Sequence, residues 1–188
     1  MPALTTKTGT TMGRKLINII LFQAAWFTAV LGAAGGNDWY GPLAVALALS
    51  VHFVLTDDRR GELKLMLVAG TLGFCFDTAL SAAGIVIPRG HILPHPLSQP
   101  WMISLWPNFA ATLNVSLEWL KGRYLLAAIF GAVGGAGSYY GGARLGATLA
   151  LPDVAGLIIL AVSWGILTPF LVWLAKRFQR KGNPVIAP

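Results

Sequence analysis

The sequence predicts an all-α integral membrane protein with six transmembrane helices and both termini in the cytoplasm. Of its 188 residues, 55% are hydrophobic and only 11% are charged, whereas a soluble domain carries about 25% charged residues. A helix needs about 20 apolar residues to cross the hydrocarbon layer, and six segments of the chain reach or approach that length. Lys and Arg concentrate in alternate connections, which indicates one membrane orientation.

The six segments divide the chain into a short N-terminal tail (1–15), one transmembrane domain (16–175) and a C-terminal tail (176–188). The second segment is short, and the third and fifth are long enough to tilt. In chain order the segments are Leu16–Ala34, Trp39–Leu55, Leu63–Ile87, Trp101–Leu120, Tyr124–Leu151 and Val154–Ala175.

The first segment resembles a signal peptide because Arg14 and Lys15 precede it. Its apolar stretch is longer than the 7–15 residues of a typical signal core, and five further segments follow. We therefore expect an uncleaved first helix.

The net charge of +7 fits membrane orientation better than nucleic-acid binding. Twelve of the 14 Lys and Arg residues fall in the two tails and in the second and fourth connections. Basic residues favour the cytoplasmic side, so both termini are expected there. An even number of spans also places the two termini on one side.

A polar stripe marks the fourth segment. Residues four apart lie on the same face of a helix, and hydrocarbon offers no water to such groups, so they should face protein or a wet cavity. We predict a binding surface on this face, made by Ser104, Asn108, Thr112 and Ser116.

Counting about 1.5 Å per residue along each helix predicts two polar layers. The outer layer comprises Asp77, Asn108, Tyr139, Tyr140 and Arg144. The layer nearer the cytoplasm comprises His52, Asn114 and Glu118, together with Asn18 and Gln23 of the first segment.

Asp77 is the most informative single residue, because a carboxylate inside a bilayer is expensive and marks a functional site by default. Its alternative role is structural, either as an ion pair with Arg144 or as a hydrogen-bonded core acid. Asp77 and His52 are the candidate catalytic residues, since either could transfer a proton. Glu118 could instead lie in the interface beside Lys121.

The fifth segment carries seven glycines between Gly131 and Gly146, several at small-xxx-small spacing. Glycines let helix backbones approach closely. We expect tight packing within one chain, with a homo-oligomer seam or a lipid-binding groove as the alternatives.

Motifs for metal or cofactor chemistry do not appear in the sequence. There is no HExxH, GxSxG or paired-cysteine pattern. His91 and His95 are four apart, but the neighbouring prolines disfavour a helix there. We expect no metal and no cofactor, and we make no prediction about whether the protein is an enzyme.

Between about residues 18 and 149 the chain contains five distinctive runs: NIILFQAAWFTAVLGAA, DDRR, the FD of Phe76-Asp77, LWPNFAATLNVSLEWL and GAVGGAGSYYGGARLGA. Together these runs resemble a bacterial family of small inner-membrane proteins of unknown function. The resemblance implies that genes of this family often lie near genes for cyclopropane-fatty-acid synthase. It therefore also implies a link to membrane lipid chemistry. Pro107 and Asn108 depart from the family pattern.

Three hypotheses follow. The first is an accessory protein or enzyme of fatty-acyl lipid modification, with membrane lipid and a lipid-modifying protein as partners. The second is a small transporter or channel that uses Asp77. The third is a non-catalytic membrane scaffold. A pocket that opens sideways favours the first, a continuous wet path favours the second, and a dry bundle favours the third.

Overall fold

The computed structural model describes residues 6–179, with side chains described from residue 12 onward. Within that range the chain is all-helical, as predicted, and forms no named strand. The outermost parts of the predicted tails lie outside the described residues. The helices are α1 (Thr6–Ala34), α2 (Tyr40–Leu55), α3 (Arg59–Ala82), α4 (Pro100–Ala110), α5 (Tyr124–Arg144) and α6 (Val154–Phe178), with a short 3₁₀ helix, η1 (Glu118–Leu120).

Three of the helices are long and apolar enough to cross a membrane: Met12–Ala34 within α1, α3 and α6. The apolar α2 has 16 residues, about 24 Å at the helical rise. Many large apolar side chains point outward, including Leu47 at 67% exposed and Val133 at 72%. Apolar residues around a whole helix are typical of a membrane-embedded segment.

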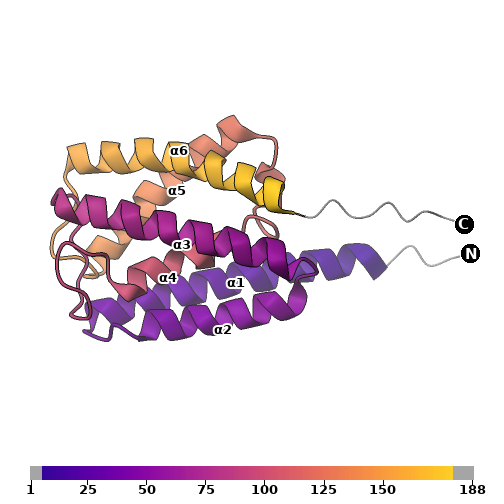
Figure 1. Ribbon diagram of the computed structural model, residues 1–188, viewed down its shortest axis with the longest axis horizontal. Helices are drawn as coiled ribbons and strands as arrows, with labels where there is room; N and C mark the ends of the chain where they lie inside the picture. The colour runs from indigo at the N-terminus through magenta and orange to yellow at the C-terminus, as the bar shows by residue number, and fades with distance from the viewer. Residues whose placement is uncertain (1–5, 180–188) are drawn as a thin grey trace, which may run out of the picture.

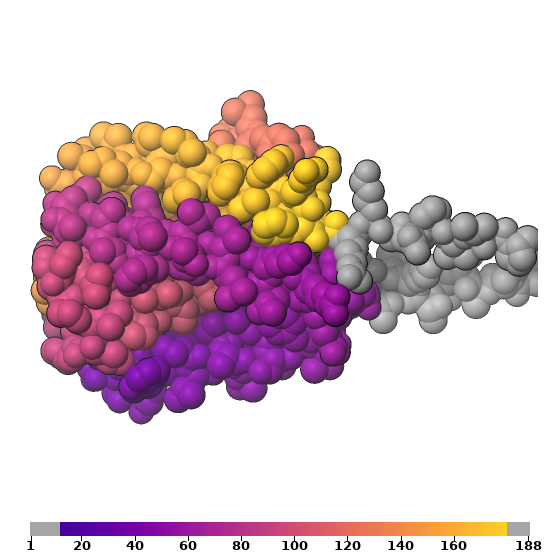
Figure 2. Space-filling model, in the orientation of Figure 1, coloured from indigo at the N-terminus to yellow at the C-terminus, as the bar shows by residue number. Residues whose placement is uncertain are grey.

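The helices run roughly along one axis, and α1 begins at the same end of the bundle at which α6 ends (Figure 1). We call this the basic end, because Arg59 and Arg123 lie at the starts of α3 and α5 there and Lys176 lies in the last turn of α6. The opposite end carries the 83–99 loop and is called the loop end. Figure 2 shows one side of the bundle, covered by α2, α3 and α6.

Helix contacts form an open arc rather than a closed ring. The short α4 packs against α1, α2 and α3, while α6 joins α3 to α5. The two ends of the arc, α1 and α5, approach each other at the loop end. There, Val30 lies beside Gly142, and Ala34 lies beside Gly146.

The fourth segment corrects the prediction most clearly. A helix was expected over Trp101–Leu120, but α4 ends at Ala110. Pro107 lies inside α4 and lacks the N–H that would bond residue 103. Beyond it the backbone changes to bonds of i to i−3 type, such as Thr112 N–H to the Phe109 carbonyl, and continues as turns to η1.

The fifth helix also ends earlier than expected, at Arg144 instead of Leu151. Gly146 has a φ of +91°, a left-handed conformation that glycine adopts without steric cost and that commonly ends helices. The following segment then meets the 83–99 loop through a bridge between Pro88 and Thr148.

Candidate functional site

A cleft with a volume of about 520 Å³ lies between α1 and α5. We call it the α1–α5 cleft. Its inner wall is formed by α4 and α6, and its lining contains no Lys, Arg, Asp or Glu. Because α1 and α5 touch only toward the loop end, the cleft lies where the arc of helices stays open.

The mouth of the cleft faces sideways, out of the bundle. Ile19 and Gln23 of α1 and Phe130 and Gly134 of α5 all line the cleft and are all exposed. The lining of α1 extends from Ile19 to Val30, which corresponds to about 16 Å along the helix axis. The cleft is therefore elongated and parallel to the helices.

Glycines of α5 shape both sides of this helix. A Cβ on Gly131 or Gly135 would collide with Thr168 or Trp164 of α6, so these glycines permit the close α5–α6 contact. Gly134 faces the cleft instead, and a Cβ there would meet nothing within 4 Å. Tight packing within one chain is thus confirmed.

Asp77 lies directly behind the aromatic wall of the cleft and is 1% exposed. Its Oδ2 accepts a hydrogen bond from Trp106 Nε1 at 2.8 Å, and its Oδ1 accepts one from the Tyr139 hydroxyl. Both aromatic side chains line the cleft. Trp106 also stacks on Trp164, with ring centroids 4.8 Å apart, so the carboxyl group is sealed from the cavity.

The predicted outer layer is only partly assembled. Asp77 and Tyr139 meet as expected, but Arg144 is exposed and does not reach Asp77. Tyr140, adjacent to Tyr139, is 41% exposed and points away from the bundle. Asn108 bonds elsewhere, donating to the Phe22 carbonyl of α1 at 3.2 Å.

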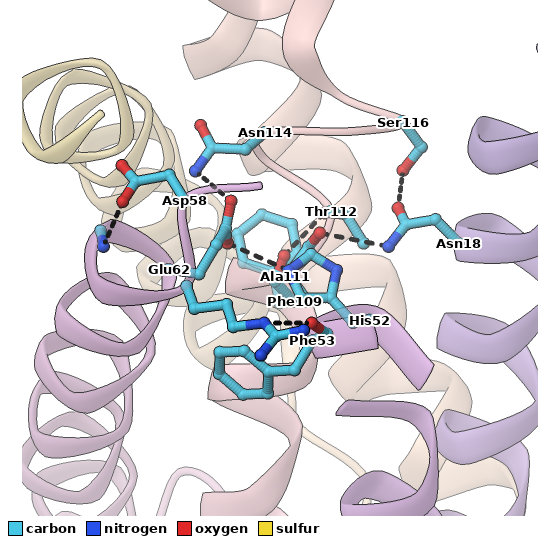
Figure 3. Close-up of polar contacts among 12 residues, drawn as sticks. Asn18, His52, Phe53, Asp58, Glu62, Phe109, Ala111, Thr112, Asn114 and Ser116 are labelled. Carbon is cyan, nitrogen blue, oxygen red and sulfur yellow. Dashed lines mark hydrogen bonds and ion pairs between the residues drawn. The ribbon is translucent and has the colours of Figure 1, made fainter. Parts of the chain in front are cut away.

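A second polar cluster lies near the basic end (Figure 3). His52 Nε2 of α2 is 3.2 Å from Glu62 Oε2 of α3, and Asn114 donates to Glu62 Oε1 at 2.8 Å. His52 and Glu62 are 6% and 4% exposed. Lys121 lies nearby, where burial lowers its pKa and the carboxylates of Glu118 and Glu62 partly oppose that shift.

The polar stripe of the fourth segment connects α4 to α1 rather than forming one continuous face. Ser116 donates to Asn18 Oδ1 at 2.6 Å, and Asn18 donates to the Ala111 carbonyl at 3.1 Å, beyond the end of α4. Thr112 bonds the Phe109 carbonyl, and Ser104 bonds the Trp101 carbonyl. Among these bonds, the one from Asn18 satisfies a carbonyl that lies beyond the end of the broken helix.

Residues 15–170 match the family described as "Protein of unknown function (DUF2878)". The chain belongs to this family. Both polar clusters and the whole lining of the cleft fall within the matched residues. No curated protein and no solved structure matches the chain.

Glu62 is the member of these clusters that sequence reasoning missed. It stands in the first turn of α3, four residues after the N-cap Asp58, where an acidic side chain ordinarily serves the helix terminus. A usable signal was its spacing to Leu65, Met66 and Ala69, which are buried on the same face of α3.

Proposed function

We propose that this protein is a multi-pass protein of the bacterial inner membrane that holds an acyl chain of a membrane lipid in the α1–α5 cleft. In this role it serves fatty-acyl lipid modification, as an accessory protein or an enzyme. The observation that carries the proposal is an elongated, uncharged cleft that opens sideways between two outward-apolar helices.

The membrane topology in this proposal has six crossings, with the basic end in the cytoplasm. The fourth crossing combines α4 with the turns that follow it, since α4 alone covers only about 16 Å. The side chains of Asn18 and Thr112 support that arrangement by bonding carbonyls near the end of α4. Non-helical backbone at membrane depth needs such protein partners.

The size of the cleft suits a single acyl chain. Its volume of about 520 Å³ falls within the range of about 300–1,000 Å³ typical of small-molecule sites. Its length of about 16 Å is half of the roughly 30 Å hydrocarbon layer, which corresponds to one leaflet. An empty cleft would forfeit dispersion contacts along its walls, so a neighbouring chain is favoured to fill it.

Transport is less well supported by the placement of the polar groups. Asp77 and Glu62 are 15 residues apart on α3, or about 22 Å along the axis. Between them the buried face of α3 is formed by Leu65, Met66, Ala69 and Gly73. The two clusters thus bond helices to one another on either side of an apolar layer.

Quenching of tryptophan fluorescence by a brominated alkane, dibromooctadecane, tests the proposal in purified protein. Four of the seven tryptophans line the cleft, so a bound brominated chain should quench emission saturably. The Gly134→Leu substitution places a side chain in the open cleft and should weaken this binding at least about tenfold, equivalent to about 1.4 kcal/mol.

The matched control is Gly137→Leu, on the same helix. A Cβ on Gly137 also meets nothing within 4 Å, but Gly137 does not line the cleft. This variant should bind dibromooctadecane as the unmodified protein does. Equal binding by both leucine variants would contradict an acyl site in the cleft.

A further inference from the structure

The polar end of the ligand can be inferred from the donors that the cleft leaves free, and this inference rests on the proposed function. Most hydroxyl groups of the lining already donate their single proton to the protein. Thr112, Ser138 and Thr148 donate to backbone carbonyls, Ser116 donates to Asn18, and Tyr139 donates to Asp77.

The indole N–H groups of the inner wall are likewise either hydrogen-bonded to the protein or buried. Trp101 donates to the Arg89 carbonyl at 2.7 Å, and Trp106 donates to Asp77. Trp164 Nε1 and Thr168 Oγ1 have no partner among the described residues, but both atoms are fully buried. None of these groups is available to donate to a molecule in the cleft.

Two donors on α1 remain. Gln23 is exposed at the mouth and Trp26 is half-buried, and both line the cleft. Neither side chain makes a hydrogen bond within the described part of the chain. They are three residues apart and therefore share one face of the helix. An unpartnered amide is unfavourable in hydrocarbon, so a ligand acceptor at this position would compensate for it.

We propose that Gln23 and Trp26 bind the ester carbonyl oxygen of the acyl lipid whose chain occupies the cleft. The Gln23 amide and the Trp26 indole N–H donate, and the carbonyl, which has two lone pairs, accepts. Gln23 lies seven residues from Leu16, or about 10 Å into the apolar part of α1 from the basic end, so the lipid comes from the leaflet on that side.

The lining distinguishes an ester from a carboxylate. It contains no Lys or Arg, and a carboxylate in an apolar site without a cation is strongly disfavoured. A neutral ester carbonyl needs only hydrogen-bond donors, which Gln23 and Trp26 supply. The site therefore selects an esterified acyl chain over a free, ionised fatty acid.

Competition against dibromooctadecane tests this assignment with four unlabelled probes: methyl myristate, dimyristoyl phosphatidylglycerol, myristic acid and tetradecane. Gln23→Leu and Trp26→Phe should each weaken competition by the two esters about threefold or more. Competition by tetradecane should be unchanged, since an alkane has no acceptor. Thr28→Val is the control on α1, because Thr28 bonds the Ala24 carbonyl and does not line the cleft.

Three outcomes would overturn the assignment. The first is an equal loss for esters and tetradecane, which would show that Gln23 and Trp26 serve packing alone. The second is no loss for any probe. The third is a loss confined to myristic acid, which would identify a free-acid site. Failure of the acyl site itself is detected separately, by the comparison of Gly134→Leu with Gly137→Leu.

Discussion

At the scale of single residues, Asp77 is held in the bundle by aromatic donors and not by a cation. Tyr139 and Trp106 each donate to one carboxyl oxygen, and they come from two different helices. Asp77 therefore connects α3 to α4 and α5. The depth of Asp77 in the third segment predicted a functional or structural role for this residue. Its hydrogen-bond partners could not be predicted, because both are aromatic residues whose spacing also fits ordinary packing.

Removing the Tyr139 hydroxyl should destabilise the bundle. Tyr139→Phe leaves one buried oxygen of Asp77 without a donor, at a cost of about 1–3 kcal/mol. The measurement is the free energy of unfolding in detergent. Tyr140→Phe is the matched control, since Tyr140 is exposed and makes no hydrogen bond within the described residues. An equal effect of both substitutions would contradict the assigned role of Tyr139.

Glu62 should contribute more to the stability of the bundle than its place in the first turn of α3 suggests. Glu62→Ala removes the acceptor of Asn114 and the charged partner of His52, which we expect to cost about 3 kcal/mol. Glu118 is half-exposed, and Glu118→Ala, which removes its pairing with Lys15 at 4.0 Å, should cost less than about 1 kcal/mol. Thermal unfolding of the two variants compares them; a reversed order would refute the buried cluster.

At the scale of elements, the sequence was sufficient for helix positions and insufficient for helix ends. The length of the apolar runs predicted all six helices, because such segments are specified by composition over many residues. Past Pro107, Thr112 bonds the nearby Phe109 carbonyl and Asn18 bonds the Ala111 carbonyl, and the Asn18 contact exists only after α1 packs on α4. The polar stripe was therefore predicted as one face and is divided by the structure.

The two faces of α5 make opposite predictions for the same substitution. Gly131→Ala should destabilise the protein, because its Cβ would collide with Thr168 and with the α6 backbone. Gly137→Ala meets open space and should stabilise the helix by about 0.5–1 kcal/mol through backbone entropy. The difference in melting temperature between the two variants measures this effect. Equal melting temperatures would argue against the α5–α6 contact.

At the scale of the whole molecule, the open arc from α1 to α5 creates the cleft. The sequence predicted a lipid groove as one alternative for the glycine-rich helix. It could not place the opening, because that depends on which helices fail to meet. Glycines also have two uses here: Gly135 removes a barrier to Trp164, while Gly134 leaves space unfilled.

The topology makes its own prediction for cysteine labelling in a Cys75→Ala background. Arg123→Cys, at the basic end, should react with an impermeant maleimide only when the cytoplasmic side is open. Arg89→Cys, in the loop at the other end, should react in intact spheroplasts. Both side chains are exposed, so each site is accessible to the reagent. Labelling of both sites from one side would contradict the proposed six crossings.

The most direct test of the central claim is photo-crosslinking with a phospholipid that carries a diazirine on its acyl chain, followed by peptide mapping. Binding in the cleft predicts adducts concentrated on its lining, at Ile19, Gln23, Phe130 and Gly134, which unlabelled lipid competes away. Gly134→Leu should remove these adducts. Adducts spread evenly over outward-facing residues such as Leu47 and Val133, and unaffected by competition, would contradict the claim.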